Sequence, residues 1–371
     1  MIKSLLLVSL MAVSPGVFAQ TAVQNPPRQI APITISPEVH ADGTVTFRVP
    51  ATNATKVTVG GDWAGGSKEM TKGENGIWSV TMGPLPPEIY SYSLNIDGVA
   101  MIDPNNVWVK PMRAPRTSVF EIPGIREYDF QKVAHGTVRS HQYESTTLNR
   151  LRSLTVYTPP GYDQNSKEKY PVLYLLHGSG DNDATWISVG RANNILDNLM
   201  SDGKARKMIV VMTDGHAIIG PQGTNRMANV SAYEKDLFTD VMPFVEHNYR
   251  TKNESKSRAI VGLSMGGGQS LNIGLNHTET FAWVGGMSAS IYDPETNLAK
   301  ALNDSKKTNK QLKLLWFQCG KDDRLVANAS ELSAILDNHQ IKHAFKITEG
   351  NHSWPVWRKY LVEFVPLIFQ D

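Results

Sequence analysis

A serine between two glycines marks the stretch of this sequence that could do chemistry most clearly, RAIVGLSMGGGQS at residues 258–270. The apolar run before Ser264 is typical of a buried strand, and the glycine-rich run after it can begin a helix. Gly262 and Gly266 permit a sharp turn that exposes the Ser264 hydroxyl, whereas the simpler alternative makes Ser264 a helix cap. As a nucleophile, Ser264 needs a base that accepts its proton.

The base and the acid are expected after strands that follow Ser264 in the chain. His352 comes just after the run HAFKITEG, and catalytic groups gather in loops that follow parallel strands. His177, in LYLLHGSGD, is a rival that precedes the serine, and its neighbouring glycines suggest a backbone role. Asp322 and Asp323 both end the run FQCGKDDRL, and the residues alone leave the choice between them open. The order serine, acid, histidine is that of the α/β hydrolases.

Two backbone N–H groups are expected to hold the negative charge that develops on an attacked carbonyl oxygen. Met265 follows the serine at the start of a helix, where the N–H has no partner within the helix. The second donor is expected in the loop HGSGD, where Ser179 is the first choice and Gly180 the alternative. The simpler alternative for this loop is a glycine-rich turn without a catalytic role.

Strand-like and helical patterns alternate from about residue 135, which predicts a mainly parallel α/β sheet with helices on both faces. The predicted strands are LTVYTPP, PVLYLLHG, MIVVMTDG, RAIVGLS, WVGGMSAS, KLLWFQCG and HAFKITEG, and residues 233–250 have helical spacing. Earlier in the chain, the short runs TVTFRVP, KVTVGGD, GIWSVTM and YSYSLNIDG predict an antiparallel β-sandwich. The proline-bearing residues 103–123 predict a domain boundary, and residues 214–236 a wall of the cleft.

Composition excludes some classes of function. With 371 residues and a hydrophobic fraction of 41%, the chain can bury a large core, and 37 Lys and Arg against 35 Asp and Glu give no support for a nucleic-acid partner. The single cysteine, Cys319, is expected in a buried strand. No metal or cofactor is predicted, because DNDATWISVGRA has Trp186 and Ala192 where a calcium loop requires glycine and glutamate.

The first residues have the pattern of a secretory signal peptide. Lys3 gives a positive start, and a short apolar run and VFAQ follow, which predicts cleavage after Ala19 and a secreted or periplasmic protein without a membrane anchor. After this signal peptide at 1–19, the proline-rich residues 20–37 are expected to be a linker. The chain then divides into a sandwich domain at 38–125 and an α/β domain at 130–371.

From about residue 142 onwards the chain resembles the secreted carbohydrate esterases related to esterase D, which include feruloyl and acetyl-xylan esterases. The resemblance rests on YPVLYLLHGSGDNDATW, RAIVGLSMGGGQS, LLWFQCGKDDRL and GNHSWPVWRKYL. It implies an α/β-hydrolase fold and hydrolysis of feruloyl esters on plant cell-wall xylan without a cofactor. The acid of the family follows a Gly-x-x-Asp pattern, which selects Asp323 over Asp322. The site residues of the family fall on Ser264, His352, Asp323, Met265 and Ser179.

The first domain resembles the immunoglobulin-like early-set domains, which are related to glycogen-binding modules. The enterochelin esterases look similar in this domain pairing, so acetyl-xylan and enterochelin-type esters stay as alternative substrates. A non-catalytic carbohydrate-binding protein is the alternative from another class. We expect this domain to be a scaffold or a wall of the cleft. Trp63, in GDWAGG, is the better exposed candidate for stacking on a sugar, and Trp78 is expected in the core.

Three further residues are candidate substrate contacts, namely His177, Trp186 and Trp354. The two tryptophans could line a pocket for an aromatic acyl group, and ordinary packing is an alternative of equal weight. The sequence leaves the oligomeric state open.

Overall fold

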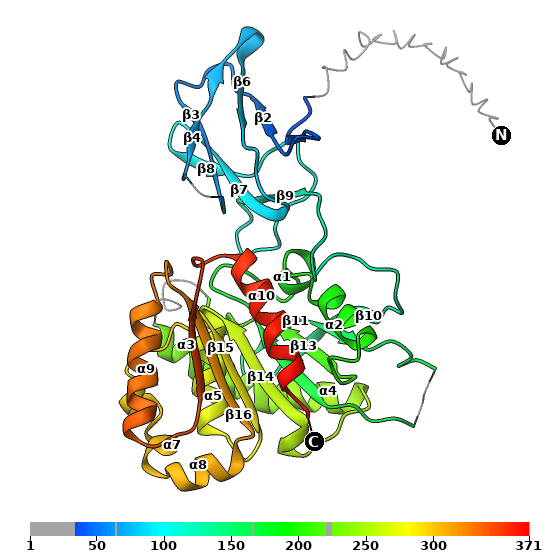
Figure 1. Cartoon of the computed structure of the whole chain (residues 1–371), viewed down its shortest axis with the longest axis vertical. Helices are drawn as coiled ribbons and strands as arrows, with labels where there is room; N and C mark the ends of the chain where they lie inside the picture. The colour runs from blue at the N-terminus through cyan, green and yellow to red at the C-terminus, as the bar shows by residue number, and fades with distance from the viewer. Residues whose placement is uncertain (1–33, 64, 165–166, 220–224, 371) are drawn as a thin grey trace, which may run out of the picture. The chain divides into compact units, whose positions relative to one another are not determined.

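The computed structural model describes residues 34–63, 65–164, 167–219 and 225–370 (Figure 1). The predicted signal peptide at 1–19 and residues 20–33 of the predicted linker lie outside the described residues. Thr34–Asp371 form one compact unit. None of the helices in the described ranges has both the length and the apolar character that crossing a bilayer needs.

The N-terminal part of the described chain is a β-sandwich, as predicted. One antiparallel sheet has the order β1-β2-β6-β5, and the other has the order β4-β3-β7-β8, with β9 also paired to β7. In β3, Val57 and Val59 are fully buried and alternate with the more exposed Thr58, so one face of the strand enters the core. The bounds are β1 Glu38–Val39, β2 Val45–Pro50, β3 Val57–Gly61, β4 Lys68–Glu69, β5 Thr71–Lys72, η1 Glu74–Gly76, β6 Ile77–Met82, β7 Glu88–Ile96, β8 Val99–Met101 and β9 Ser118–Ile122.

Residues 103–123 belong to the sandwich, which corrects the expectation of a domain boundary there. Asp103 is fully buried, and its Oδ2 accepts hydrogen bonds from Ser36 Oγ at 2.5 Å and Tyr92 Oη at 2.8 Å. At the other end of the segment, β9 pairs with β7. The prolines here mark turns and not the end of a domain, because a proline restricts only its own backbone and the residue before it.

Trp63 lies in the sandwich core, so the expectation of an exposed stacking ring is wrong. The residue is 6% exposed, and its Nε1 donates to Gly66 O at 3.0 Å. Its ring packs near Phe47, with ring centroids 5.8 Å apart. The loop folds the indole inward, and the pattern GDWAGG does not distinguish that conformation from an outward one. Trp78 is buried as predicted.

The second part of the chain forms a sheet with the order β10-β11-β13-β12-β14-β15-β16-β17. The pairs β10–β11 and β11–β13 are antiparallel, and the other pairs are parallel. The seven predicted strands are present, and Cys319 in β16 is fully buried as expected. Their bounds are β11 Arg150–Thr158, β12 Val172–Leu176, β13 Ile209–Thr213, β14 Arg258–Leu263, β15 Trp283–Met287, β16 Leu314–Gly320 and β17 Ala344–Thr348. The sequence does not predict β10 (Thr137–Ser145), because this edge strand is polar and mostly exposed.

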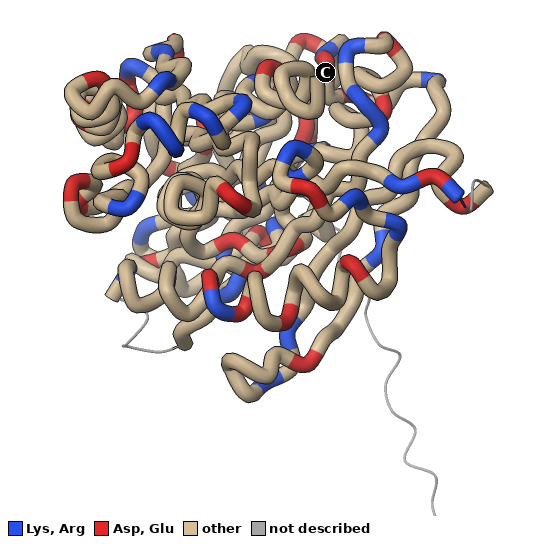
Figure 2. The backbone as a smooth tube through the Cα atoms, turned by 90° about the horizontal axis from the view of Figure 1, so that it is seen from below, with Lys and Arg blue, Asp and Glu red and all other residues tan. Residues whose placement is uncertain are grey.

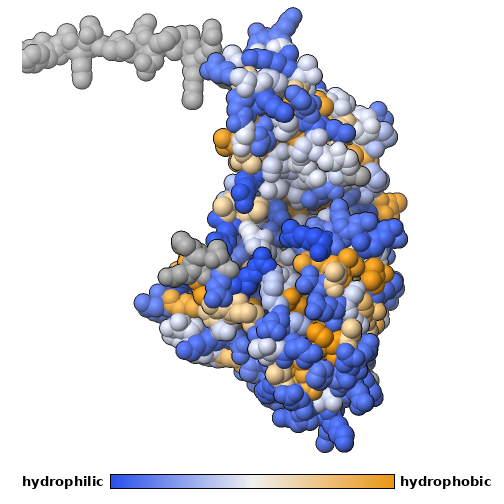
Figure 3. Space-filling model, turned by 90° about the vertical axis from the view of Figure 1, so that its left-hand side faces the viewer, coloured by the Kyte–Doolittle hydropathy of each residue, from blue (hydrophilic) through white to orange (hydrophobic). Residues whose placement is uncertain are grey.

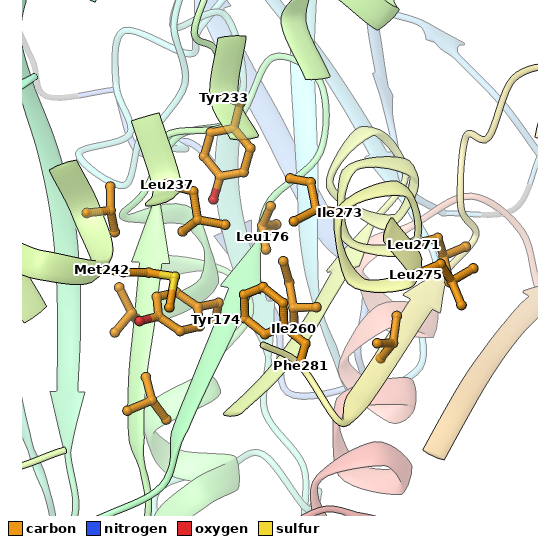
Figure 4. Packing of buried hydrophobic residues seen from close by; sticks show 14 of the residues in the cluster. Tyr174, Leu176, Tyr233, Leu237, Met242, Ile260, Leu271, Ile273, Leu275 and Phe281 are labelled. Atoms are coloured by element: carbon orange, nitrogen blue, oxygen red, sulfur yellow. The ribbon is translucent and has the colours of Figure 1, made fainter. Parts of the chain in front are cut away.

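Alternate residues of the central strands enter two cores on opposite faces of this sheet. In β12, Tyr174 and Leu176 pack with Ile260 in the core that α3, α4, α5 and α9 cover (Figure 4). Leu173 and Leu175 belong to the other core, which α2 and α10 cover. Burial on both faces explains why these strands are apolar nearly throughout. The helix bounds are α1 Thr185–Ser188, α2 Ala192–Ser201, α3 Arg226–Asp236, α4 Met242–Asn248, η4 Ser255–Ser257, α5 Met265–Asn276, α6 Pro294–Asn297, α7 Ala299–Asn303, α8 Ser305–Gln311, α9 Val326–Asn338, α10 Trp354–Phe364 and η5 Val365–Leu367.

The helix predicted at residues 233–250 is interrupted by a π-helical turn, η3 (Leu237–Val241), between α3 and α4. Pro243 lies at the start of α4 and has no N–H to continue the α-helical hydrogen bonds. In a π turn each backbone hydrogen bond spans five residues and not four, so the turn is wider but the chain continues as a helix.

Charged residues of both signs are interspersed along the backbone (Figure 2). On the face in Figure 3, hydrophilic residues surround smaller groups of hydrophobic ones. The near balance of charge in the sequence is therefore also distributed in space.

Arg358 of α10 connects the α/β part to the sandwich. Its side chain is fully buried, and its Nη2 donates to Glu88 Oε1 at 2.7 Å and to Ile89 O at 2.9 Å, both in β7. Its Nη1 donates to Val189 O at 2.8 Å, and Tyr128 Oη donates to Glu88 Oε1 at 2.6 Å. Charged groups tolerate such burial only when hydrogen bonds replace their hydration.

Replacing Arg358→Leu would leave the Glu88 carboxylate buried without its cation. We expect the free energy of unfolding, measured by urea denaturation, to fall by about 3 kcal/mol or more. The matched control is Arg48→Leu, because the Arg48–Glu38 pair is as short, at 2.7 Å, but its side chains are 32% and 38% exposed. The control should lose less than about 1 kcal/mol. Equal losses in the two variants would contradict this account.

Candidate active site

Ser264 lies on a strained turn between β14 and α5. Its φ of 51° and ψ of −112° are unusual for a residue with a side chain. Backbone hydrogen bonds fix this conformation: Ser264 N donates to Met287 O at 2.8 Å, and Ser264 O accepts from Gly268 N at 3.0 Å and Ser290 N at 2.9 Å. The turn directs the hydroxyl into the cleft above the sheet, and the simpler alternative of a helix cap is not observed, because the side chain forms no capping hydrogen bond.

The two glycines beside Ser264 are required by close packing. A Cβ atom on Gly262 would lie 2.5 Å from the carbonyl of Gly266. A Cβ atom on Gly266 would lie 2.4 Å from His177 O at the end of β12. Real Cβ atoms do not approach backbone atoms so closely, so the turn folds in this form only with glycine at both positions.

Three side chains from different loops meet at this turn. His352 Nε2 lies 2.9 Å from Ser264 Oγ, and His352 Nδ1 lies 2.8 Å from Asp323 Oδ2. Because the carboxylate accepts the Nδ1 hydrogen, Nε2 is left to accept the hydroxyl proton. The imidazole stands at right angles to the Trp357 indole, with ring centroids 4.9 Å apart, which restricts its rotation.

Asp323 is the aspartate that contacts the histidine. It is 2% exposed, and Leu325 N donates to its Oδ1 at 2.9 Å. Burial on its own would raise the pKa of Asp323, but the hydrogen bonds from His352 and Leu325 N outweigh burial and lower that pKa. Asp322 is exposed and faces a different cavity, which Glu349 also lines.

The two predicted oxyanion donors line the same cavity as Ser264. In the part of the chain that the structure describes, the N–H groups of Met265 and Ser179 donate to no protein acceptor. Met265 begins α5, so the positive end of the helix also points to this place. Their role in holding an oxyanion stays a prediction.

A segment of the sandwich, residues 110–113, lies against the Ser179 loop, and we call it the strap. Arg113 N donates to Gly180 O at 2.9 Å, and Lys110 Nζ lies 2.8 Å from Asp181 Oδ1. These contacts support the loop that carries one expected donor, and they bring Arg113 to the edge of the cavity. The N-terminal part thus contributes a wall of the cleft.

The cavity beside Ser264 has a volume of about 730 Å³. His216, Arg226 and Asn229 line one side of it, so described residues of the segment 214–236 form a wall as expected. Apolar contact comes from Val230, Tyr292 and Leu325, among others. Sequence reasoning missed Arg113, Tyr292 and Arg324, because isolated residues in loops carry no periodic or motif signal.

The three candidate substrate contacts do not line this cavity, which corrects that expectation. His177 is 1% exposed, its Nε2 accepts from Gly215 N at 2.9 Å, and its Nδ1 donates to Gly178 O at 2.8 Å. Nε2 therefore joins the loop after β12 to the loop after β13, and Nδ1 is used within its own loop.

Trp186 and Trp354 are packed in the core behind the site. They are 0% and 2% exposed, and their rings meet edge to face with centroids 5.0 Å apart. Trp186 Nε1 donates to Leu176 O at 3.0 Å. Both indoles belong to the core that α2 and α10 cover, so ordinary packing is the observed alternative.

A sheet of this order, with the serine on its strand-to-helix turn and the aspartate and histidine after later strands, defines an α/β hydrolase. Residues 145–368, more than half of the chain, match the esterase family described as "Putative esterase". The chain belongs to this family.

Two curated relatives combine this region with other parts. An endo-1,4-beta-xylanase/feruloyl esterase of Xylanibacter ruminicola is 32% identical over 359 residues, which cover 94% of this chain and 47% of that protein. Endo-1,4-beta-xylanase Y of Acetivibrio thermocellus is 26% identical over 254 residues, which cover 61% of this chain and 23% of that protein. The chain thus spans less than half the length of these relatives.

Solved structures share the fold. A ferulic acid esterase is 30% identical, with a TM-score of 0.56, and the match covers 62% of this chain and 97% of that one. The enterobactin esterase of Shigella flexneri has a TM-score of 0.64 over 86% of this chain and 92% of that one, at 16% identity. The second likeness concerns the fold alone, and it extends over more of the chain.

His216 in the cavity wall gives a pH-dependent prediction. Burial, with help from the charges of His177 and Arg113 and against the opposing charge of Asp214, lowers the pKa of His216 to about 4 from an ordinary value of 6.5. The unfolded chain therefore takes up this proton first as the pH falls, so the stability contributed by neutral His216 is present at pH 7 and is lost between about 6.5 and 4. We expect this group to lower the free energy of unfolding by about 2 kcal/mol between pH 7 and pH 5.

Urea denaturation of the parent and of His216→Gln at both pH values measures this contribution. The variant should lose about 2 kcal/mol less than the parent over the same interval. An identical loss in the two proteins would show that His216 titrates normally in the folded state.

Proposed function

We propose that this chain is a secreted serine esterase that hydrolyses feruloyl esters of plant cell-wall xylan. The observation that carries the proposal is the hydrogen-bonded series from Ser264 through His352 to Asp323, at 2.9 and 2.8 Å. Membership of the esterase family supports ester hydrolysis. The proposed secretion rests on the N-terminal sequence alone, which lies outside the described residues.

The first half of the reaction forms an acyl-enzyme. Ser264 Oγ attacks the ester carbonyl while His352 Nε2 takes its proton. The N–H groups of Met265 and Ser179 stabilise the tetrahedral oxyanion. His352 then gives the proton to the leaving alcohol, and the sugar departs with its hydroxyl restored.

The second half releases the acid. Water takes the place of the alcohol, His352 accepts its proton, and the resulting nucleophile attacks the acyl-enzyme. Ser264 leaves as the regenerated hydroxyl. Throughout, Asp323 holds the imidazole in the tautomer with hydrogen on Nδ1 and stabilises its charged form. The cycle needs no cofactor.

The feruloyl class is supported by two observations of different kinds. The relative from Xylanibacter ruminicola is named a xylanase/feruloyl esterase, and a solved structure with 30% identity is a ferulic acid esterase. The cavity wall also offers Tyr292, Val230 and Leu325 for contact with an aromatic acyl group. Its volume of about 730 Å³ is in the range of small-molecule sites.

An enterobactin-type ester is the second candidate, because the enterobactin esterase likeness covers 86% of this chain. Its 16% identity leaves the substrate undetermined. An acetyl ester would use the same three residues and would leave most of the cavity unfilled. A non-catalytic carbohydrate-binding protein would have no need for the strained Ser264 turn.

Ester turnover by the purified chain and by Ser264→Ala tests the reaction. We expect the parent to cleave methyl ferulate, and the variant to lose about 10⁶-fold in kcat because the nucleophile is absent. Cleavage of 4-nitrophenyl acetate alone would keep the esterase and overturn the feruloyl class. A folded parent that cleaves neither ester would overturn both.

The two neighbouring aspartates provide a matched pair for the acid. Asp323→Asn should lower kcat by about 10⁴-fold, because the amide cannot hold the same histidine tautomer. Asp322→Asn makes the same chemical change at an exposed position that faces another cavity, and it should change kcat less than about threefold. Steady-state kinetics on methyl ferulate measure both. A larger loss of kcat in Asp322→Asn than in Asp323→Asn would show that Asp322, and not Asp323, is the acid.

A further inference from the structure

Three arginines line the cavity that contains Ser264, namely Arg113, Arg226 and Arg324. In the described ranges, none of the three lies within ion-pair distance of a carboxylate, and the arginines that form ion pairs there are others. They come from the strap, from the start of α3 and from the loop after β16. In the described chain, three guanidinium groups without a carboxylate partner therefore line one cavity, although the net charge of the whole chain is only +2.

Two of these side chains are held in place by uncharged groups. Arg113 Nη1 lies 3.1 Å from His216 Nδ1, and the guanidinium of Arg226 lies 4.6 Å from the centroid of the Tyr292 ring. Each contact orients the planar group and leaves its charge uncompensated. A cationic site that is positioned before binding loses less conformational entropy when an anion arrives.

The two carboxylates near this cavity already accept hydrogen bonds from other groups. Asp323 accepts from His352, and Asp214 accepts from His216 N at 2.9 Å in a neighbouring cavity that Arg113 also lines. No acidic side chain of the described chain lines the Ser264 cavity itself. The cavity is therefore electropositive although the chain as a whole is nearly balanced.

The same wall contains acceptors that lack donors. Gln269 and Asn272 are 0% and 3% exposed, and their Nε2 and Nδ2 groups donate to Gly215 O and Gly268 O, each at 2.8 Å. Within the described residues, the amide oxygens of both have no hydrogen-bond partner. A buried acceptor without a donor is unfavourable, and a hydroxyl group from a ligand or a water molecule satisfies it once it reaches the oxygen.

Arginines for a carboxylate and amide oxygens for hydroxyls together describe an acidic sugar. We infer that the cavity beside Ser264 selects ester substrates whose saccharide carries a uronic acid, with its carboxylate held by Arg113, Arg226 and Arg324. This inference rests on the proposed function, because it places the acidic sugar beside the ester that Ser264 attacks. Guanidinium groups bind carboxylates through paired hydrogen bonds, which an uncharged sugar cannot replace.

Calorimetric binding to the full chain carrying Ser264→Ala tests the inference without turnover. The two probes are xylotriose bearing a glucuronic acid unit and the same oligosaccharide with that carboxylate reduced to an alcohol. We expect the acidic probe to bind about tenfold more tightly, and the difference to shrink at high salt. Arg113→Gln, Arg226→Gln and Arg324→Gln should each remove most of the difference.

Arg116→Gln is the matched control, because Arg116 is also exposed and lies near the strap but does not line the cavity. The control should keep the full preference for the acidic probe. Equal affinity for the two probes, or a preference that all three arginine variants retain, would overturn the inference. Because binding is measured separately from turnover, an inactive parent that still prefers the acidic probe would overturn the proposed hydrolysis and support the acidic-sugar site.

Discussion

The positive φ of Ser264 is the constraint on which the site depends. A side chain at φ 51° is unfavourable, and the surrounding backbone hydrogen bonds and the contact between β14, α5 and β12 keep it there. The same close approach places His177 O against Gly266, which sets the start of the Ser179 loop. This one turn thereby positions the proposed nucleophile, Ser264, close to the two N–H groups that are expected to hold the oxyanion.

The sandwich is joined to this arrangement at two places with different physical character. Arg358 makes a buried connection through both terminal nitrogens of its guanidinium group, and it lies on α10, the helix that follows His352. The strap makes the second contact, through Arg113 N and the largely buried Lys110–Asp181 ion pair, with the loop of Ser179. The N-terminal part thus supports the loops that carry the proposed site residues, in agreement with the expected scaffold and cleft wall.

Sequence patterns predicted the parts of the fold that depend on local regularity. The seven apolar strands and the mainly parallel sheet follow from local periodicity, and the turn at Ser264 follows from its flanking glycines, whereas the order of the strands in the sheet was not predicted. The sequence did not predict the edge strand β10, which is polar and mostly exposed, or the π turn η3, which lies just before Pro243 inside an otherwise helical pattern. The sequence also could not place Trp186 and Trp354, because a large aromatic residue is equally suited to a substrate pocket and to a core until its neighbours are known.

By itself the sequence determined the family, the order of serine, acid and histidine, and the residues that can take those roles. The residues alone did not distinguish Asp322 from Asp323, and the family resemblance selected Asp323. Only the tertiary structure showed that the Asp323 carboxylate contacts His352 Nδ1. Only the tertiary structure gathered Arg113, Arg226 and Arg324 around one cavity. The reason is physical: local patterns encode backbone periodicity, whereas the charge of a cleft is the sum of side chains from distant segments that meet only after the chain has folded.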